Sequence, residues 1–198
     1  ADHGESLYDH HKLLHGDAYW DTVVNVPLVM RVPGLDGRAE IYDQLVSHVD
    51  LMPTLLELVG AVTPADIDGR SMVPLLTGES DEVRDMALVE GGVAKQTARV
   101  LKGAVVAPPY MLVRQDRGCD GPPGLDPPRQ PGDPGLFLYH LDEDPGQFTN
   151  IARQNMPLVE ALLGRWQSFR DARAKEATQL ELDPAFIAEL KANGYNFE

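Results

Sequence analysis

The sequence predicts a mixed α/β fold whose second half is a small antiparallel sheet packed with a C-terminal helix. Residues 86–141 hold short apolar segments without long helices between them, which is typical of antiparallel strands. Residues 157–174 repeat apolar side chains at helical spacing. Residues 23–32 form a β-branched run, which is typical of a buried strand in a parallel sheet. Together, these patterns predict a partial parallel α/β core over residues 1–85 and a four-stranded antiparallel subdomain over residues 86–198.

The N-terminal part is expected to bury two aromatic side chains and to form a second strand. A helical turn before the first strand would carry Tyr19 and Trp20 to the core. Residues 41–49 would form the second strand. Asp50 would then cap a helix over residues 51–59 through its side chain.

That helix is expected to bury one apolar stripe. The stripe consists of Leu51, Leu55, Leu58 and Val59. His48, just before the helix, is expected to pack as a core histidine rather than to line a cleft. Residues 72–76 would form a short helical turn that Gly78 ends.

The C-terminal part is expected to contain four strands and two helices. The strands are placed at residues 86–90, 96–102, 110–115 and 137–141. A connection over residues 116–135, rich in Pro and Gly, would join the last two strands. The helix over residues 157–174 is expected to lie across one face of the sheet with Trp166 as a buried anchor, and a last helix would span residues 183–192.

The composition excludes several classes of protein. The chain has 198 residues, 43% of them hydrophobic, and a formal net charge of −14. Nucleic acids and anionic membranes attract basic proteins, so neither is expected as a partner. No apolar run approaches the roughly 18 residues of a membrane span, and the single cysteine, Cys119, excludes an internal disulfide. Because the sequence starts inside a motif and without methionine, we expect the N-terminal part of a larger protein to be missing.

Carboxylate and imidazole groups cluster at the start of the chain. Residues 1–16 hold four of the six histidines. A carboxylate beside an imidazole is a common pair of metal ligands. Adjacent residues of a regular strand point to opposite faces. Asp2 and His3 would therefore share one ion only where the backbone leaves a strand, and Gly4 permits such a break.

Six sequence blocks, taken in order, resemble the sulfatase family. They are Asp2-His3-Gly4-Glu5-Ser6-Leu7, His15-Gly16 with Val26-Pro27-Leu28-Val29, and residues 48–56, 68–78, 138–146 with 149–150, and 190–195. The blocks span nearly the whole chain, and their order is more specific than any single block. The resemblance implies the C-terminal portion of a formylglycine-dependent sulfatase, with an alkaline-phosphatase-like core and a metal at the carboxyl ends of its parallel strands.

The resemblance also implies where the nucleophile lies. In that family a formylglycine is made from the cysteine of a C-x-P-x-R motif. Cys119 is followed two residues later by Gly121 and does not match, so the nucleophile is expected upstream of this chain. The full-length protein would hydrolyse sulfate esters of small molecules or glycans, and this chain alone would be inactive.

The resemblance assigns roles to residues of the first block. Asp2 and His3 would be two metal ligands, with the others in the missing part of the protein. Ca²⁺ is the usual ion of the family, while an imidazole ligand leaves Mn²⁺ and Zn²⁺ open. His15 lies where the family places a Lys or His that contacts the leaving-group oxygen, and Lys12 is the alternative for that role.

Three neighbouring residues are given no catalytic role. Glu5 is expected to bond loop amides, and His10 and His11 are expected to be loop residues. Two alternatives to a sulfatase stay open. One is a phosphonate monoester or phosphodiester hydrolase of the same superfamily, and the other is a non-catalytic binding or interaction module.

Overall fold

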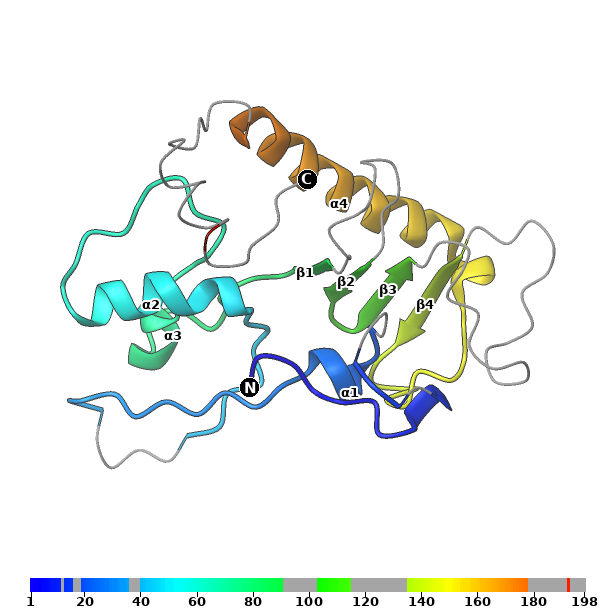
Figure 1. Cartoon of the computed structure of the whole chain (residues 1–198), viewed down its shortest axis with the longest axis horizontal. Helices are drawn as coiled ribbons and strands as arrows, with labels where there is room; N and C mark the ends of the chain where they lie inside the picture. The colour runs from blue at the N-terminus through cyan, green and yellow to red at the C-terminus, as the bar shows by residue number, and fades with distance from the viewer. Residues whose placement is uncertain are drawn as a thin grey trace.

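A computed structural model describes residues 1–11, 13–15, 19–35, 40–90, 103–114, 135–177 and 192 (Figure 1). In chain order the elements are the 3-10 helix η1 (Asp9–His11), α1 (Asp21–Val24), the 3-10 helix η2 (His48–Asp50), α2 (Leu51–Leu58), α3 (Val73–Thr77), β1 (Ala87–Glu90), β2 (Gly103–Ala107), β3 (Tyr110–Arg114), β4 (Leu136–His140), the 3-10 helix η3 (Ala152–Asn155) and α4 (Met156–Ala177). None of the helices in these ranges combines the length and apolar character that crossing a membrane requires.

The four strands form one antiparallel sheet in the order β1-β2-β3-β4. This confirms the mixed α/β class and the antiparallel sheet. The strand expected over residues 96–102 lies outside the described residues, and β2 occupies residues 103–107, for which no strand is predicted. Ala104 and Val105 in β2 are both fully buried. The strand was missed because a segment covered on both faces shows no polar alternation.

The two faces of the sheet carry two separate apolar cores, because successive side chains of a strand point to opposite faces. On one face, helix α4 packs Val159, Leu162 and Trp166 against the sheet. The sheet contributes Val105, Leu112 and Leu138 to that core. Figure 1 shows α4 running across this face. The helix expected over residues 157–174, with Trp166 as its anchor, is therefore confirmed.

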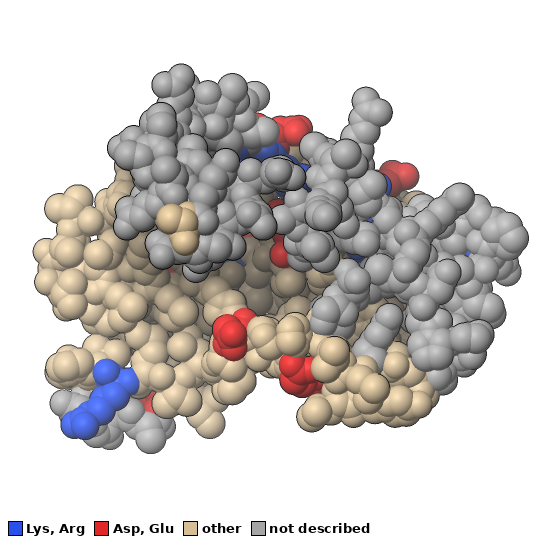
Figure 2. Space-filling model, viewed as in Figure 1, with Lys and Arg blue, Asp and Glu red and all other residues tan. Residues whose placement is uncertain are grey.

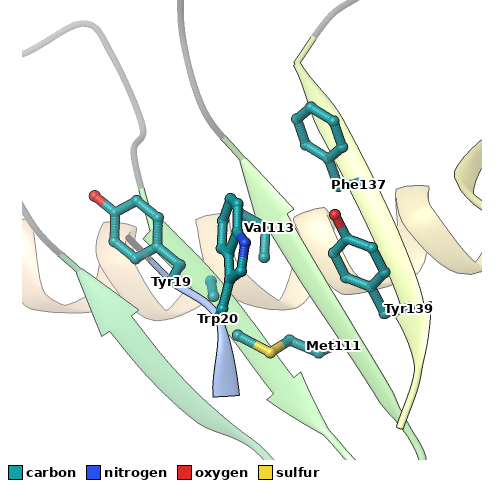
Figure 3. Packing of buried hydrophobic residues seen from close by; sticks show 7 residues of the cluster. Tyr19, Trp20, Met111, Val113, Phe137 and Tyr139 are labelled. Atoms are coloured by element: carbon teal, nitrogen blue, oxygen red, sulfur yellow. The ribbon is translucent and has the colours of Figure 1, made fainter. Parts of the chain in front are cut away.

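The opposite face of the sheet is covered by the N-terminal segment. Tyr19 and Trp20 lie over this face, as Figure 3 shows. The sheet residues beneath them are Ala104, Met111, Val113, Phe137 and Tyr139. The expected burial of Tyr19 and Trp20 is confirmed. Their packing holds the segment that carries the Asp-His motif against the sheet. The division of the chain after residue 85 stays a prediction.

The prediction of two strands in the N-terminal part is wrong. Residues 21–24 form helix α1, and the rest of the β-branched run up to residue 32 is not in a strand. Residues 41–47 are likewise outside any strand. A parallel strand is stable only beside a neighbour that forms a hydrogen-bonded ladder with it. Among the described residues, only isolated backbone bonds such as the one from Gly4 to Val23 reach the first segment, and no ladder forms with either segment. Val29 and Ile41 are accordingly almost fully exposed.

Helix α2 begins and ends close to the expected residues, but it buries a different face. Its buried side chains are Pro53 and Thr54. Leu55, Leu58 and Val59, which the apolar pattern assigned to the core, are exposed. The short helix α3 and its end at Gly78, which has a left-handed φ of 79°, are confirmed.

Asp50 does not cap α2 with its side chain, so this expectation is also wrong. Its carboxylate turns back and accepts hydrogen bonds from the Ser47 amide at 2.8 Å and the Arg70 amide at 2.8 Å. The guanidinium of Arg84 also bonds it, through Nε at 2.8 Å and through Nη2. The fully buried carboxylate therefore joins three separate segments of the N-terminal part.

Other expectations fall largely outside the described residues. These are the connection over residues 116–135 and the last helix over residues 183–192, so both stay predictions.

Figure 2 shows one face of the molecule, where the described acidic side chains lie apart from one another and basic atoms are seen most clearly at the lower left corner. The described part of this face therefore shows no continuous basic surface.

Candidate metal and active-site residues

The N-terminal motif is held against helix α1 by a contact that requires glycine. The Gly4 amide donates a hydrogen bond to the Val23 carbonyl at 2.9 Å. A Cβ atom at Gly4 would lie 2.1 Å from the Thr22 carbonyl oxygen, closer than any side chain could approach. The close packing of Asp2-His3-Gly4 on α1 therefore depends on the missing side chain.

Asp2 and His3 lie side by side and face solvent. His3 Nε2 is 3.8 Å from Asp2 Oδ2, and the side chains are 43% and 91% exposed, respectively. Backbone hydrogen bonds from the Asp2 and His3 amides, and the neighbouring His3 ring, hold the pKa of the Asp2 carboxyl below its usual value. The carboxylate is therefore ionised and open to a cation at neutral pH.

The loop after the motif brings two further groups to His3. The His15 ring lies 3.9 Å from the His3 ring, centroid to centroid. His15 Nδ1 lies 2.5 Å from Glu5 Oε1. His3, Glu5 and His15 each offer one possible ligand atom, and these three atoms lie within 4.8 Å of one another. Glu5 thus contacts an imidazole, where the sequence had predicted loop amides.

This set of donors fits a divalent cation, although its chemistry is mixed. Two imidazoles and a carboxylate match the ligands of Mn²⁺, Fe²⁺ or Zn²⁺. Ca²⁺ prefers oxygen ligands, which only Asp2 and Glu5 would supply here. The structure places Asp2 beside the three clustered residues without including it in the cluster.

The remaining candidates are distributed differently. Lys12 lies outside the described residues, so its role stays a prediction. His48 is exposed and its Nε2 is 3.0 Å from the Ala1 carbonyl oxygen, so the expected core packing is wrong. His10 lies in the short helix η1, but its side chain is only 6% exposed. No local pattern signals this burial, because Gln147 and Phe148, which contact the ring, lie far along the chain.

A family profile matches this part of the chain. It is the profile described as N-sulphoglucosamine sulphohydrolase, C-terminal, and it covers residues 9–90. The Delta 4,5-hexuronate-2-O-sulfatase of Bacteroides thetaiotaomicron is 25% identical over 193 residues, covering 93% of this chain and 37% of that protein. The chain is therefore similar to the C-terminal portion of sulfatases, within the alkaline phosphatase superfamily.

Solved structures share the fold of this sulfatase portion. A 2-O GAG sulfatase superposes with a TM-score of 0.63 at 24% identity, over 92% of this chain and 37% of that one. The phosphonate monoester hydrolase of Agrobacterium radiobacter superposes with a TM-score of 0.57 at 26% identity, over 87% of this chain and 34% of that one. The chain thus spans less than two fifths of the length of these relatives.

Proposed function

We propose that this chain forms part of a sulfuric-ester hydrolase in which a metal and a formylglycine nucleophile act together. The nucleophile would be supplied by residues outside this chain. The observation that carries the proposal is the meeting of His3, Glu5 and His15 beside Asp2 on one loop. The similarity to sulfatases adds the expectation of sulfate-ester chemistry.

Asp2 and His3 would hold the metal in this proposal. The sulfatase family generally uses a divalent metal. Both side chains are exposed, so ligands from another part of the protein could complete the coordination shell. A bound divalent cation would supply electrostatic stabilisation to the oxygens of the sulfate group. Ca²⁺ is the first candidate by family resemblance, and the imidazoles keep Mn²⁺ and Zn²⁺ as candidates.

His15 would act on the leaving-group oxygen. The contact between its Nδ1 and Glu5 fixes the ring and leaves Nε2 free to approach a substrate. A proton donated from Nε2 would neutralise the charge that develops on the leaving-group oxygen as the S–O bond breaks. The positive charge and longer reach of Lys12 keep it as the alternative for this role.

Helix α2 has an exposed apolar surface that another part of the same protein could cover. Met52 and Leu55 are exposed and, at spacing i and i+3, lie on one face of the helix, and Val59 directly after the helix is also exposed. The opposite face is already buried through Pro53 and Thr54. A helix that is apolar on both faces is normally enclosed. We propose that the other part of the sulfatase core covers this face, because the chain spans only 37% of the hexuronate sulfatase.

The substrate is proposed to be a sulfate ester of a small molecule or glycan. The second candidate is a phosphonate monoester, because the Agrobacterium radiobacter phosphonate monoester hydrolase shares the fold and 26% of aligned residues. The third candidate is a non-catalytic binding or interaction module.

The full-length protein is expected to hydrolyse 4-nitrophenyl sulfate with a higher kcat/KM than 4-nitrophenyl phenylphosphonate. The 198-residue chain alone is expected to show no turnover above buffer, because its sequence lacks the C-x-P-x-R motif and, in this proposal, part of the metal shell lies outside it. Steady-state kinetics on both substrates checks this. A preference for the phosphonate would favour the phosphonate monoester hydrolase, and inactivity of the full-length protein on both substrates would favour the non-catalytic module. Turnover by the 198-residue chain alone would contradict the claim that the active site is split.

A further inference from the structure

His10 is enclosed between the N-terminal motif and the sheet subdomain. Its ring stacks on Phe148 with centroids 4.9 Å apart at 13°, and it meets the edge of Trp20 at 4.8 Å. Its Nε2 lies 3.1 Å from the Gln147 carbonyl oxygen. A carbonyl only accepts, so Nε2 carries the proton of this bond. Its Nδ1 lies 3.1 Å from Asp9 Oδ2.

The residue that receives this bond is itself fixed to the sheet. Gln147 is 2% exposed, and its side-chain amide donates to Met111 Sδ in β3 at 2.9 Å. Its side-chain oxygen accepts the Asp21 amide of α1 at 2.6 Å. Figure 3 shows Met111 and Trp20 on the same face of the sheet. His10 therefore connects the loop to a rigid support.

The loop that His10 anchors has an unfavourable backbone. Leu7, Tyr8, His10 and His11 all have positive φ, between 46° and 76°. Residues without the freedom of glycine keep such angles only where surrounding contacts impose them. Glu5 precedes this stretch and His15 follows it, so its shape decides whether their side chains meet.

We infer that His10 is a positioning residue for the active site, on the basis of the proposed sulfatase function. Its bond to Gln147 and its packing between Trp20 and Phe148 hold the loop so that Glu5 reaches His15. It does not contact the substrate. Loss of the bond therefore misplaces His15 during the chemical step, while groups elsewhere in the site still bind the ester.

Two isosteric replacements separate the hydrogen bond from the packing. The amide of Gln overlays Nε2 of histidine, whereas the shorter amide of Asn overlays Nδ1. In the full-length protein, His10→Asn should lower kcat for 4-nitrophenyl sulfate by about 100-fold, the size of effect that a displaced catalytic group produces, with KM nearly unchanged. His10→Gln should restore most of kcat. His11→Asn is the matched control, because its ring contacts only Tyr8, edge-on at 5.0 Å, among the ring contacts the structure describes.

A second measurement keeps the test independent of turnover. Hydrogen–deuterium exchange over residues 5–15 should accelerate most in His10→Asn, which loses both the bond and the stacking. It should accelerate less in His10→Gln, which keeps the bond to Gln147, and stay at the wild-type rate in His11→Asn. Phe148→Ala removes the stacking from a side chain that is 68% exposed and should accelerate the same exchange without unfolding the protein. Wild-type exchange in both His10→Asn and Phe148→Ala would overturn the inference. An inactive wild-type protein with the expected exchange pattern would instead contradict the proposed function alone.

Discussion

Replacing Asp50 with alanine is expected to lower the free energy of unfolding by about 3–5 kcal/mol, as when one partner of a buried ion pair is removed. The substitution leaves the guanidinium of Arg84, whose side chain is 11% exposed, without its carboxylate. It also leaves the Ser47 and Arg70 amides without their acceptor. Urea unfolding followed by circular dichroism measures the loss.

An exposed ion pair provides the matched control for Asp50. Arg165 Nη2 lies 2.6 Å from Asp85 Oδ2, but the two side chains are 42% and 64% exposed. Asp85→Ala should therefore cost less than about 1 kcal/mol. The double variant Asp50→Ala with Arg84→Ala should lose less than the sum of its single variants, because the unpaired charge is gone. Equal losses for Asp50→Ala and Asp85→Ala would contradict the role of Asp50 in joining the N-terminal segments.

Replacing Trp166 with alanine is expected to lower the free energy of unfolding by a similar amount, about 3–5 kcal/mol. The indole is fully buried between α4 and the sheet, and its Nε1 donates to Glu90 Oε1 at 2.7 Å. Gly103 in β2 lies directly beneath it, since a Cβ there would be 3.1 Å from the indole ring. Alanine would leave a cavity over Gly103, which has no side chain to fill it.

The control for Trp166 lies at the next position of the same helix. Gln167 is exposed and bonds Asp171 one turn later at 2.7 Å. Gln167→Ala should cost no more than about 0.5 kcal/mol. The loss of unfolding free energy in Trp166→Phe should fall between those of Trp166→Ala and Gln167→Ala, because phenylalanine keeps most of the apolar volume but loses the bond to Glu90. Thermal unfolding followed by circular dichroism checks the order, and a loss below about 1 kcal/mol for Trp166→Ala would contradict the packing described.

The sheet and its helix could be predicted because their signals are local. Short apolar segments place β1, β3 and β4, and the repeat of apolar side chains places α4. The strand expected over residues 23–32 failed for a non-local reason. A β-branched run favours a strand only when another strand lies beside it, and the described residues offer no such neighbour.

The candidate site could be located from the sequence, but not its contacts. The Asp-His-Gly-Glu motif predicts metal chemistry at the start of the chain, and the structure brings His3, Glu5 and His15 together there. The meeting of Glu5 with His15 depends on the positive φ angles at residues 7, 8, 10 and 11, which residue propensities disfavour. The burial of His10 likewise depends on Gln147 and Phe148, more than 130 residues away. Such distant contacts leave no pattern within a local window.

The metal content of the full-length protein tests the central claim most directly. The claim is that Asp2 and His3 supply one side of a divalent-metal site. Mass spectrometry of the purified protein should find one equivalent of metal per chain in the wild type and in Asp43→Ala, a control at another exposed carboxylate. Asp2→Ala should lose both the metal and the turnover of sulfate ester. Wild-type metal content in Asp2→Ala would contradict the assignment.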